Sequence, residues 1–330
     1  MTANLTPDYF AAEKRFKEAR TPSEKLTALK EMLSALPKHK GTEKMQADLK
    51  RRIKAATEEA QKKTRGARSN IPSIAPEGMG QLVLVGAPNS GKSALVARVS
   101  GAPIEVADYP YTTRLPQPGM LRYEDLQFQL VDMPPISAEY MESWVPTLVR
   151  SADGVLLVAD LDDPDLLGGL EVAEHRLSER RIDLVRPAPG VRPRPAQERV
   201  SMPTLLVGTK LDRPGARDNL EVLADLYGTR FPVVPVSVES GEGLDRLARA
   251  VFELRDIVRV YTKQPGKKPD MDSPFVVARG STVMDLAEKV HKELAARLAF
   301  ARIWAPGKYD GQRVPRDHVL ADRDVIELHD

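Results

Sequence analysis

A glycine-rich segment that ends in lysine and serine is the strongest chemical signal in this sequence of 330 residues. Residues 86–93 read GAPNSGKS and fit the pattern G-x-x-x-x-G-K-[ST], between an apolar run, QLVLV, and an amphipathic stretch, ALVARV. In such a loop backbone N–H groups surround a β-phosphate, Lys92 contacts the β- and γ-phosphate oxygens, and the Ser93 hydroxyl binds Mg²⁺. The alternative is a glycine-rich turn with an ordinary exposed lysine. The predicted phosphate-binding residues are Gly86, Asn89, Ser90, Gly91, Lys92, Ser93 and Ala94.

An aspartate at the end of a later apolar run is the candidate second ligand of the same Mg²⁺. Asp132 ends the run QFQLVD, where a Walker-B-type carboxylate holds the ion through water. An aspartate at a strand end is often only a helix N-cap. One intervening strand separates Asp132 from the glycine-rich loop, and this spacing favours the metal-binding interpretation.

The segment TKLD at residues 209–212, directly after the apolar run TLLVG, indicates which base is bound. A carboxylate at Asp212 can accept hydrogen bonds from both N1–H and the N2 amine of guanine, whereas adenine has an acceptor at N1 and lacks the amine. Lys210 would lay its aliphatic stem over the base. The sequence therefore predicts GTP as the nucleotide and leaves ATP as the weaker alternative. The predicted base-site residues are Thr209, Lys210, Asp212, Ser237 and Val238.

Composition excludes several classes of protein. With 42% apolar and 29% charged residues, the chain is neither wholly disordered nor fibrous. It contains no cysteine, which excludes disulfides, thiolate nucleophiles, Fe–S clusters and cysteine-based zinc sites. No apolar run approaches the length of about 18 residues that a membrane span needs, and the first residues carry no signal-like segment. We therefore expect a cytoplasmic protein without a membrane partner.

The first 70 residues have a net positive charge, whereas the rest of the chain has a net negative charge. They hold 17 Lys and Arg residues against 9 Asp and Glu, although the net charge of the whole chain is only +2. Such asymmetry is typical of an arm that faces nucleic acid, and equally of a solvated helical face. We predict that this segment and the C-terminal region face a polyanion such as RNA; the alternative is that the helices only pack, with their charges in solvent.

Alternating apolar runs and amphipathic stretches predict the elements that position these motifs. Residues 1–66 are rich in Ala, Lys, Glu and Leu and predict helices, and residues 67–79 resemble a linker. Within residues 80–256, short β-branched runs alternate with helical stretches and predict an α/β domain with a mostly parallel sheet and helices on both faces. These runs lie at 82–85, 128–131, 155–159, 204–207 and 233–236. The proline-rich stretch 186–203 predicts an extended surface loop without regular structure.

Residues 257–330 predict a small α+β module. A helix is expected over residues 283–298. Strands are expected near 258–261, 275–277, 301–304 and 325–328.

The order GAPNSGKS, YPYTT, DMPP, TKLD, SVE resembles a translation-factor-class GTPase of the Obg group, in particular its Drg branch. The C-terminal text, VRVYTKQPGKKPDMDSPFVVARGSTVMDLAEKVHKEL followed by ARIW and VPRDHVLADRDVIEL, is similar to the TGS module that ends Drg proteins. GTEKMQADLKRRIK resembles the helical segment ahead of their G domain. The resemblance implies a P-loop GTPase domain and a ubiquitin-like β-grasp TGS domain that contacts RNA or a protein partner, with the whole chain acting near the ribosome.

The resemblance also implies roles for single residues. Thr113, in the pair Thr112-Thr113, would bind Mg²⁺ in the triphosphate state, and Asn89 would bind a K⁺ ion as it does in several relatives. Together with Lys92 these residues form the predicted catalytic set. Ile136 stands where related enzymes keep a water-orienting glutamine, so hydrolysis of GTP to GDP and phosphate should be slow. The alternative function is a GTP/GDP-responsive RNA- or protein-binding scaffold with little or no hydrolysis.

Three departures from the family stand out. The domain that Drg proteins insert between the Mg²⁺ carboxylate strand and the TKxD strand is replaced by the proline-rich stretch, and Obg's glycine-rich N-terminal domain is absent. The D-x-P-G motif of the family appears as DMPP, with Pro135 in place of glycine. Proline has no N–H to donate to a γ-phosphate, so we expect a weakened response to the nucleotide. The alternative is that the loop shifts by one residue and the N–H of Ile136 takes over.

Overall fold

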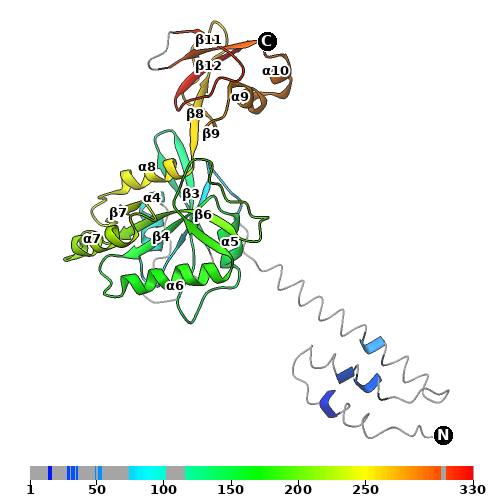
Figure 1. Ribbon diagram of the computed structural model, residues 1–330, viewed down its shortest axis with the longest axis vertical. Coiled ribbons are helices and arrows are strands. Elements are labelled where there is room, and N and C mark those ends of the chain that lie inside the picture. Colours follow the sequence, from blue (N-terminus) through cyan, green and yellow to red (C-terminus); the bar gives the residue numbers. More distant parts are fainter. Residues whose placement is uncertain are drawn as a thin grey trace, which may run out of the picture. The chain divides into compact units, whose positions relative to one another are not determined.

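The chain forms two units, Met1–Pro72 and Ser73–Asp330. The computed structural model describes residues 14–16, 28–29, 31–33, 35, 49, 51–53, 74–101, 116–305 and 310–329 (Figure 1). In the first unit the described residues are helical, and Leu29, Met32 and Leu49 form a small buried cluster. Most of the predicted helical segment 1–66 and of the linker 67–79 lies outside the described residues.

A seven-stranded sheet forms the centre of the second unit. Its strands follow the order β2-β3-β1-β4-β6, and both β5 and β7 pair with β6. Strand β2 runs antiparallel to β3, and every other pair in this sheet is parallel. The predicted mostly parallel sheet is thereby confirmed. The strands are β1 Gln81–Val85, β2 Gln117–Tyr123, β3 Leu126–Asp132, β4 Gly154–Asp160, β5 Ile182–Val185, β6 Val200–Thr209 and β7 Val233–Pro235.

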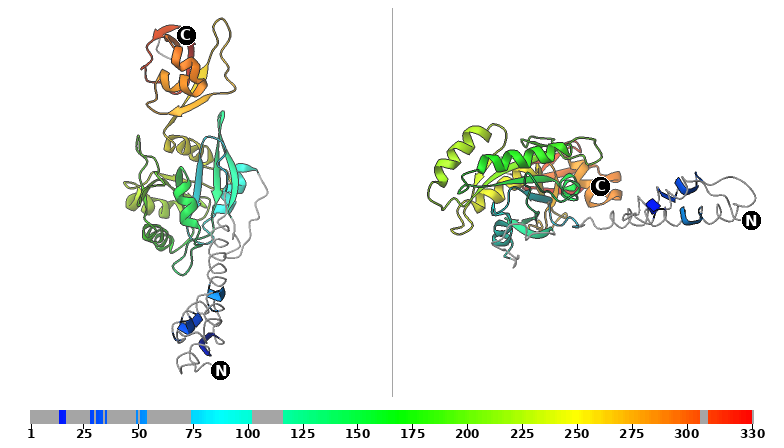
Figure 2. Two further views of the ribbon diagram at one scale, coloured as in Figure 1. Left: turned by 90° about the vertical axis from the view of Figure 1, so that its right-hand side faces the viewer. Right: turned by 90° about the horizontal axis from the view of Figure 1, so that it is seen from below.

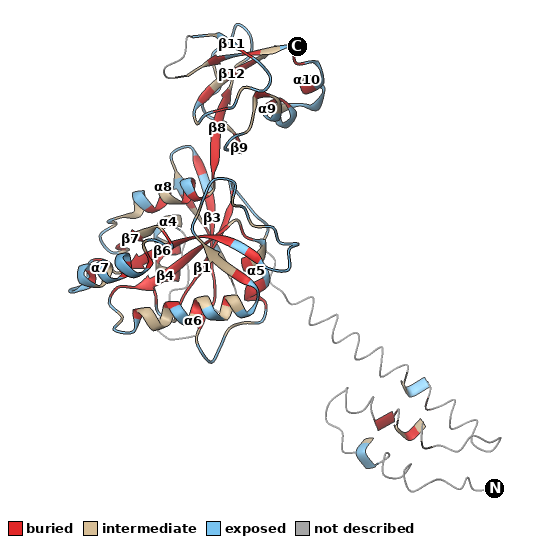
Figure 3. Cartoon of the chain, viewed as in Figure 1, coloured by how far each residue is buried: buried red, intermediate tan, exposed pale blue. Residues whose placement is uncertain are grey.

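Helices cover both faces of this sheet (Figures 1 and 2). Successive side chains of β1 point to opposite faces, so Val83 and Val85 belong to one buried cluster and Leu82 and Leu84 to another. Figure 3 shows that β1 is buried. The first cluster also holds buried residues of α5, α6 and α7, and the second those of α4 and α8. The helices are α4 Lys92–Ser100, α5 Val145–Ser151, α6 Leu166–Glu179, α7 Ala216–Tyr227 and α8 Leu244–Leu254. Within the described part of the chain, no helix has the length and apolar character to span a bilayer.

The proline-rich stretch is shorter than the sequence predicts. Residues 200–203 were expected in the irregular loop, but they form the start of β6, where Pro203 pairs with Val185 of β5. This start of β6 pairs with β5 alone, because the pairing with β4 begins only at Thr204. A strand that is paired on one side tolerates proline, since it can direct the position without an N–H away from the ladder.

The C-terminal residues form a second, five-stranded sheet of order β11-β10-β12-β8-β9. Strands β8 and β12 are parallel, and helices α9 and α10 pack on the sheet, which gives the predicted β-grasp arrangement. The single helix predicted over 283–298 is wrong in one detail: His291 is extended, ends α9, and accepts the N–H of Glu293 at the start of α10. The elements are β8 Ile257–Thr262, β9 Phe275–Ala278, α9 Val283–Val290, α10 Lys292–Arg297, β10 Phe300–Trp304, β11 Gln312–Val314 and β12 Asp324–His329.

A buried arginine joins the two sheets. Arg259 of β8 is 3% exposed and pairs with Asp322, 2.7 Å from its carboxylate, and with Asp125 and Glu124 at the turn between β2 and β3. Its guanidinium also lies over the Phe252 ring of α8, 5.0 Å from the centroid. Although burial acts against the charge, the hydrogen bonds to these three carboxylates raise the pKa of Arg259 above its usual value. The β2–β3 hairpin is thus tied to the C-terminal sheet by a permanent charge.

Candidate functional site

Two glycines shape the loop between β1 and α4. Gly86 has a φ of 157° and Gly91 a φ of 86°. A Cβ on Gly86 would lie 2.3 Å from the Val158 carbonyl oxygen, and one on Gly91 would lie 3.2 Å from the Thr209 hydroxyl. The close backbone contact and the left-handed conformations both require glycine. The loop therefore wraps tightly at the start of α4, and the N-terminus of a helix favours an anion.

The predicted lysine occupies the inside of this loop. The Lys92 ammonium is buried and donates to the Ala87 carbonyl at 2.6 Å, the Gly86 carbonyl at 3.2 Å and the Ser90 hydroxyl at 3.1 Å. Burial lowers the pKa of Lys92 to about 8, against the opposing effect of the Asp132 charge. A nearby anion such as phosphate stabilises the charged form of a buried cation whose other partners are neutral acceptors.

A hydroxyl and a carboxylate meet next to this lysine. Ser93, at the start of α4, donates its hydroxyl hydrogen to Asp132 over 2.6 Å, and Asp132 is fully buried at the end of β3. The parallel register of β1 and β3, which sets Leu84 beside Asp132, brings the two residues together. Oxygen ligands of these two types are the ones that Mg²⁺ prefers, so the donor set fits this ion. The third predicted ligand, Thr113, lies outside the described residues.

Thr209 ties the phosphate loop to the next motif. Its buried hydroxyl lies 2.8 Å from the Ser90 carbonyl oxygen and 3.2 Å from that of Ala159. The following residue, Lys210, has a φ of 59° and pairs with Asp160 over 2.5 Å. Asp160 was not among the predicted site residues. Its signal was available in the sequence, since it ends an apolar run as Asp132 does, and in the sheet it pairs with Thr209.

The predicted base-recognition residues form a second group at the same edge of the sheet. Ser237 donates its hydroxyl to Asp212 over 2.6 Å and accepts the N–H of Ser240 at 3.1 Å. The hydrogen bond from Ser237 lowers the pKa of Asp212, so this carboxylate is ionised and can only accept. The N–H of Leu211 donates to the Val236 carbonyl, which joins the TKLD and SVE segments. The arrangement leaves an oriented carboxylate that can accept two N–H groups from one ligand edge.

The DMPP segment is held against the phosphate loop. Met133 and Ile136 are buried in the same core cluster as Val83 and Val85 of β1, and Pro135 is also buried. The N–H of Ile136 donates to the Gly86 carbonyl at 3.1 Å. The N–H that would replace the one missing at Pro135 is therefore bonded to the loop. Ile136 itself has no side-chain group that could orient a water molecule.

The predicted residues fall into three sets. The residues Gly86, Ser90, Gly91, Lys92, Ser93, Asp132 and Thr209 contact one another around the phosphate loop. Asp212 and Ser237 form the separate base-recognition pair, next to the half-buried Val238. Asn89 is exposed with a φ of 58°, and Ala94 is half-buried in the first turn of α4.

Two family models match this chain. The model described as "50S ribosome-binding GTPase" matches residues 81–186, and the TGS domain model matches residues 258–330. The chain therefore combines a GTPase domain with a C-terminal TGS domain, and the relatives it is similar to include developmentally-regulated GTP-binding proteins. This result confirms the resemblance, the GTPase fold and the β-grasp module that the sequence predicted.

Several curated relatives align over most of the length of this chain. It is 28% identical to an uncharacterized GTP-binding protein of Methanocaldococcus jannaschii, with 92% of each chain covered. It is 26% identical to developmentally-regulated GTP-binding protein 1 of Xenopus laevis, covering 77% of this chain and 83% of the relative. It is 24% identical to ribosome-interacting GTPase 1 of Saccharomyces cerevisiae, covering 93% and 99%. Among solved structures, Era of Aquifex aeolicus matches with a TM-score of 0.42 at 18% identity, covering 68% of this chain and 71% of Era.

The depressed pKa of Lys92 makes nucleotide binding depend on pH. Bound phosphate stabilises the charged ammonium, so binding should take up a proton where free Lys92 is neutral, above its pKa of about 8. We expect uptake of most of a proton per GDP at pH 8.5, little uptake at pH 7, and affinity that falls as pH rises through 8. Titration calorimetry in two buffers of different ionisation enthalpy measures this uptake.

The Lys92→Arg variant is the matched control, because arginine keeps the charge and does not titrate in this range. If the Lys92→Arg variant still binds GDP, it should not show the extra proton uptake at pH 8.5 that we expect of the wild-type chain. Equal uptake by the wild-type chain at pH 7 and pH 8.5 would contradict the assignment.

Proposed function

We propose that the chain binds GTP and slowly hydrolyses it to GDP and phosphate. The observation that supports this most directly is the pairing of Asp212 with Ser237 at the same sheet edge as the phosphate loop. The loop residues suit phosphates in any nucleotide, but an ionised carboxylate that only accepts hydrogen bonds suits guanine and not adenine. The alternative, a nucleotide-responsive scaffold with little turnover, shares the binding site and differs only in the rate of hydrolysis.

The proposed roles follow from the contacts. Lys92 places its charge on the β- and γ-phosphate oxygens, where negative charge grows as the bond to the γ-phosphate breaks. Ser93, Asp132 and Thr113 would hold Mg²⁺, which when bound neutralises charge on the same phosphates. Asn89, exposed in the loop, is the candidate ligand for K⁺. Hydrolysis should be slow because Ile136 cannot orient the attacking water.

Measurement of phosphate release at saturating GTP tests this function. Without a water-orienting residue we expect turnover on the order of 10⁻³ s⁻¹ or below, faster in KCl than in NaCl if Asn89 binds K⁺. The Asp212→Asn variant should have a lower affinity for GTP and a higher affinity for xanthosine triphosphate, because the xanthine base presents an acceptor where guanine has an amine.

Three outcomes would count against parts of the proposal. Tight GTP binding without phosphate release above background would favour the scaffold, and equal rates in KCl and NaCl would exclude the K⁺ role. Unchanged nucleotide preference in Asp212→Asn would remove the guanine assignment.

We propose the ribosome, or RNA, as the partner, and the cytoplasm as the location. This rests on the name of the yeast relative, a ribosome-interacting GTPase, and on the net positive charge of the first 70 residues. The TGS domain could instead hold a protein partner.

We expect the GTP-loaded chain to co-sediment with ribosomal subunits, with affinity that falls steeply with salt as phosphate contacts release counterions. Removal of residues 1–66 should weaken this binding at about 0.1 M salt. Unchanged affinity after this removal would indicate that the charges of residues 1–66 face solvent and do not contact the ribosome. A failure to co-sediment at any salt concentration would contradict the ribosome as the partner.

Pro135 should reduce the difference between GTP and GDP binding. A hydrogen bond to a charged oxygen contributes about 1.5 to 3 kcal/mol, so Pro135→Gly should raise the GTP-over-GDP preference roughly ten- to a hundredfold. The structure favours this outcome because the neighbouring N–H of Ile136 is bonded to Gly86. Affinities for both nucleotides measure the ratio. Pro134→Gly adds the same backbone freedom one residue earlier and is the control; the same ratio in all three proteins would show that proline is simply tolerated.

A further inference from the structure

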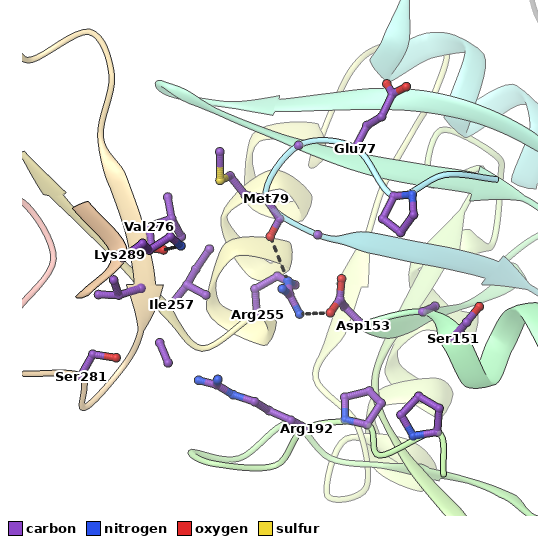
Figure 4. A pocket seen from close by; sticks show the side chains of 18 of the residues that line it. Glu77, Met79, Ser151, Asp153, Arg192, Arg255, Ile257, Val276, Ser281 and Lys289 are labelled. Carbon is purple, nitrogen blue, oxygen red and sulfur yellow. Dashed lines mark hydrogen bonds and ion pairs between the residues drawn. The ribbon is translucent and has the colours of Figure 1, made fainter. Parts of the chain in front are cut away.

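A cavity of about 710 Å³ lies at the sheet edge opposite the phosphate loop (Figure 4). Its walls are the segments that enter β1 and β4, the proline-rich loop, the link from α8 to β8, and the edge of the TGS domain formed by β9 and α9. Strand β1 begins at this cavity and ends at the phosphate loop, so the two sites are about 17 Å apart along the strand. The volume is that of a site for a small molecule.

One wall carries an arginine in a fixed position. Arg255 pairs with Asp153 over 2.8 Å and donates its Nε to the Met79 carbonyl at 3.2 Å. Asp153 is itself fixed by the N–H of Gln81, which it accepts at 2.8 Å. A Cβ on Gly80 would lie 2.1 Å from the Arg255 Nε, so glycine there makes room for the guanidinium. The side chain is only 18% exposed, which makes it a preorganised cation at the cavity wall.

A second arginine approaches from the proline-rich loop. Figure 4 shows the Arg192 side chain extending from this loop toward Ser281 and Ile257 of the opposite wall. The loop is held by the N–H of Gly190, which donates to Asp256 at 3.0 Å. Burial lowers the pKa of Arg255; the charge of Asp153 opposes this shift, and the charge of Arg192 adds to it. The two guanidinium groups therefore repel each other across a space that an anion would stabilise.

Three basic side chains, those of Arg192, Arg255 and Lys289, and three acidic ones line the cavity. Lys289 of α9 donates to the Val276 carbonyl at the rim. Of the lining carboxylates, Asp153 is paired with Arg255, Asp285 accepts the N–H of Thr282 in the cap of α9, and Glu77 points away from both arginines (Figure 4). Among the residues that the structure describes, no carboxylate forms an ion pair with Arg192 or Lys289.

We propose that this cavity binds a small phosphate-bearing molecule, with the phosphate between Arg192 and Arg255 and within reach of Lys289. Guanidinium groups bind phosphate oxygens in pairs of parallel hydrogen bonds, which suits two arginines on facing walls. The apolar side chains of Ile257, Val276 and Met79 supply a surface for the rest of the molecule. The site is distinct from the GTP site and does not depend on hydrolysis.

Equilibrium dialysis of the full chain, with its nucleotide site filled by GDP and Mg²⁺, tests the proposal. The probes are inorganic pyrophosphate, adenosine 5′-monophosphate and adenosine. We expect saturable binding of the two phosphate-bearing probes and none of adenosine. Arg192→Gln should weaken phosphate binding about tenfold or more, because it removes a charged hydrogen-bond donor. Arg194→Gln, an exposed neighbour on the same loop that does not line the cavity, should bind as the wild type does.

A variant that retains GDP is folded. The Lys289→Gln variant should also bind the phosphate-bearing probes more weakly than the wild-type chain. The proposal is overturned if neither phosphate-bearing probe binds saturably, if adenosine binds as well as its monophosphate, or if Arg192→Gln and Arg194→Gln have equal affinities. None of these outcomes bears on GTP turnover, so they leave the proposed function unaffected.

Discussion

The parallel pairing of β3, β1, β4 and β6 is the constraint on which the nucleotide site depends. Parallel strands end at a common edge, so residues far apart in the sequence become neighbours when each follows its strand. The pairing sets Leu84 beside Asp132 and Asp160 beside Thr209. A shift of one residue would turn Asp132 into the opposite face of the sheet and separate it from Ser93. The alternating apolar side chains on the two faces fix this register, because a shift would also move them out of their cores.

Polar contacts between the motifs hold the same edge together. Thr209 holds the Ser90 carbonyl, and Ile136 holds that of Gly86. Backbone groups that are satisfied in this way need no rearrangement to keep the loop closed. The loop therefore keeps its curvature through contacts with β6 and with the segment that follows β3.

The sequence predicts most of this edge because its signals are local. Lys92 and Asp212 lie in short motifs next to apolar runs, and those runs locate β1 and β6 to within a few residues. Strands β2 and β5 were missed, since their pattern is weak and their place depends on pairing with distant partners. The start of β6 at Val200 was missed for the same reason. Its proline-rich composition predicts an irregular loop, but pairing with β5 makes these residues a strand. The Arg259 cluster gave no sequence signal at all, because its carboxylates are about 60 and 130 residues away.

The β2–β3 hairpin has one further consequence. Its open end carries Asp132, and its closed end carries Glu124 and Asp125, which hold Arg259 of the TGS domain. The strands are hydrogen-bonded over seven residues each, which corresponds to about 24 Å. The hairpin therefore links two distant places in the fold: one end lies at the site of the predicted metal, and the other holds a buried arginine of the C-terminal domain.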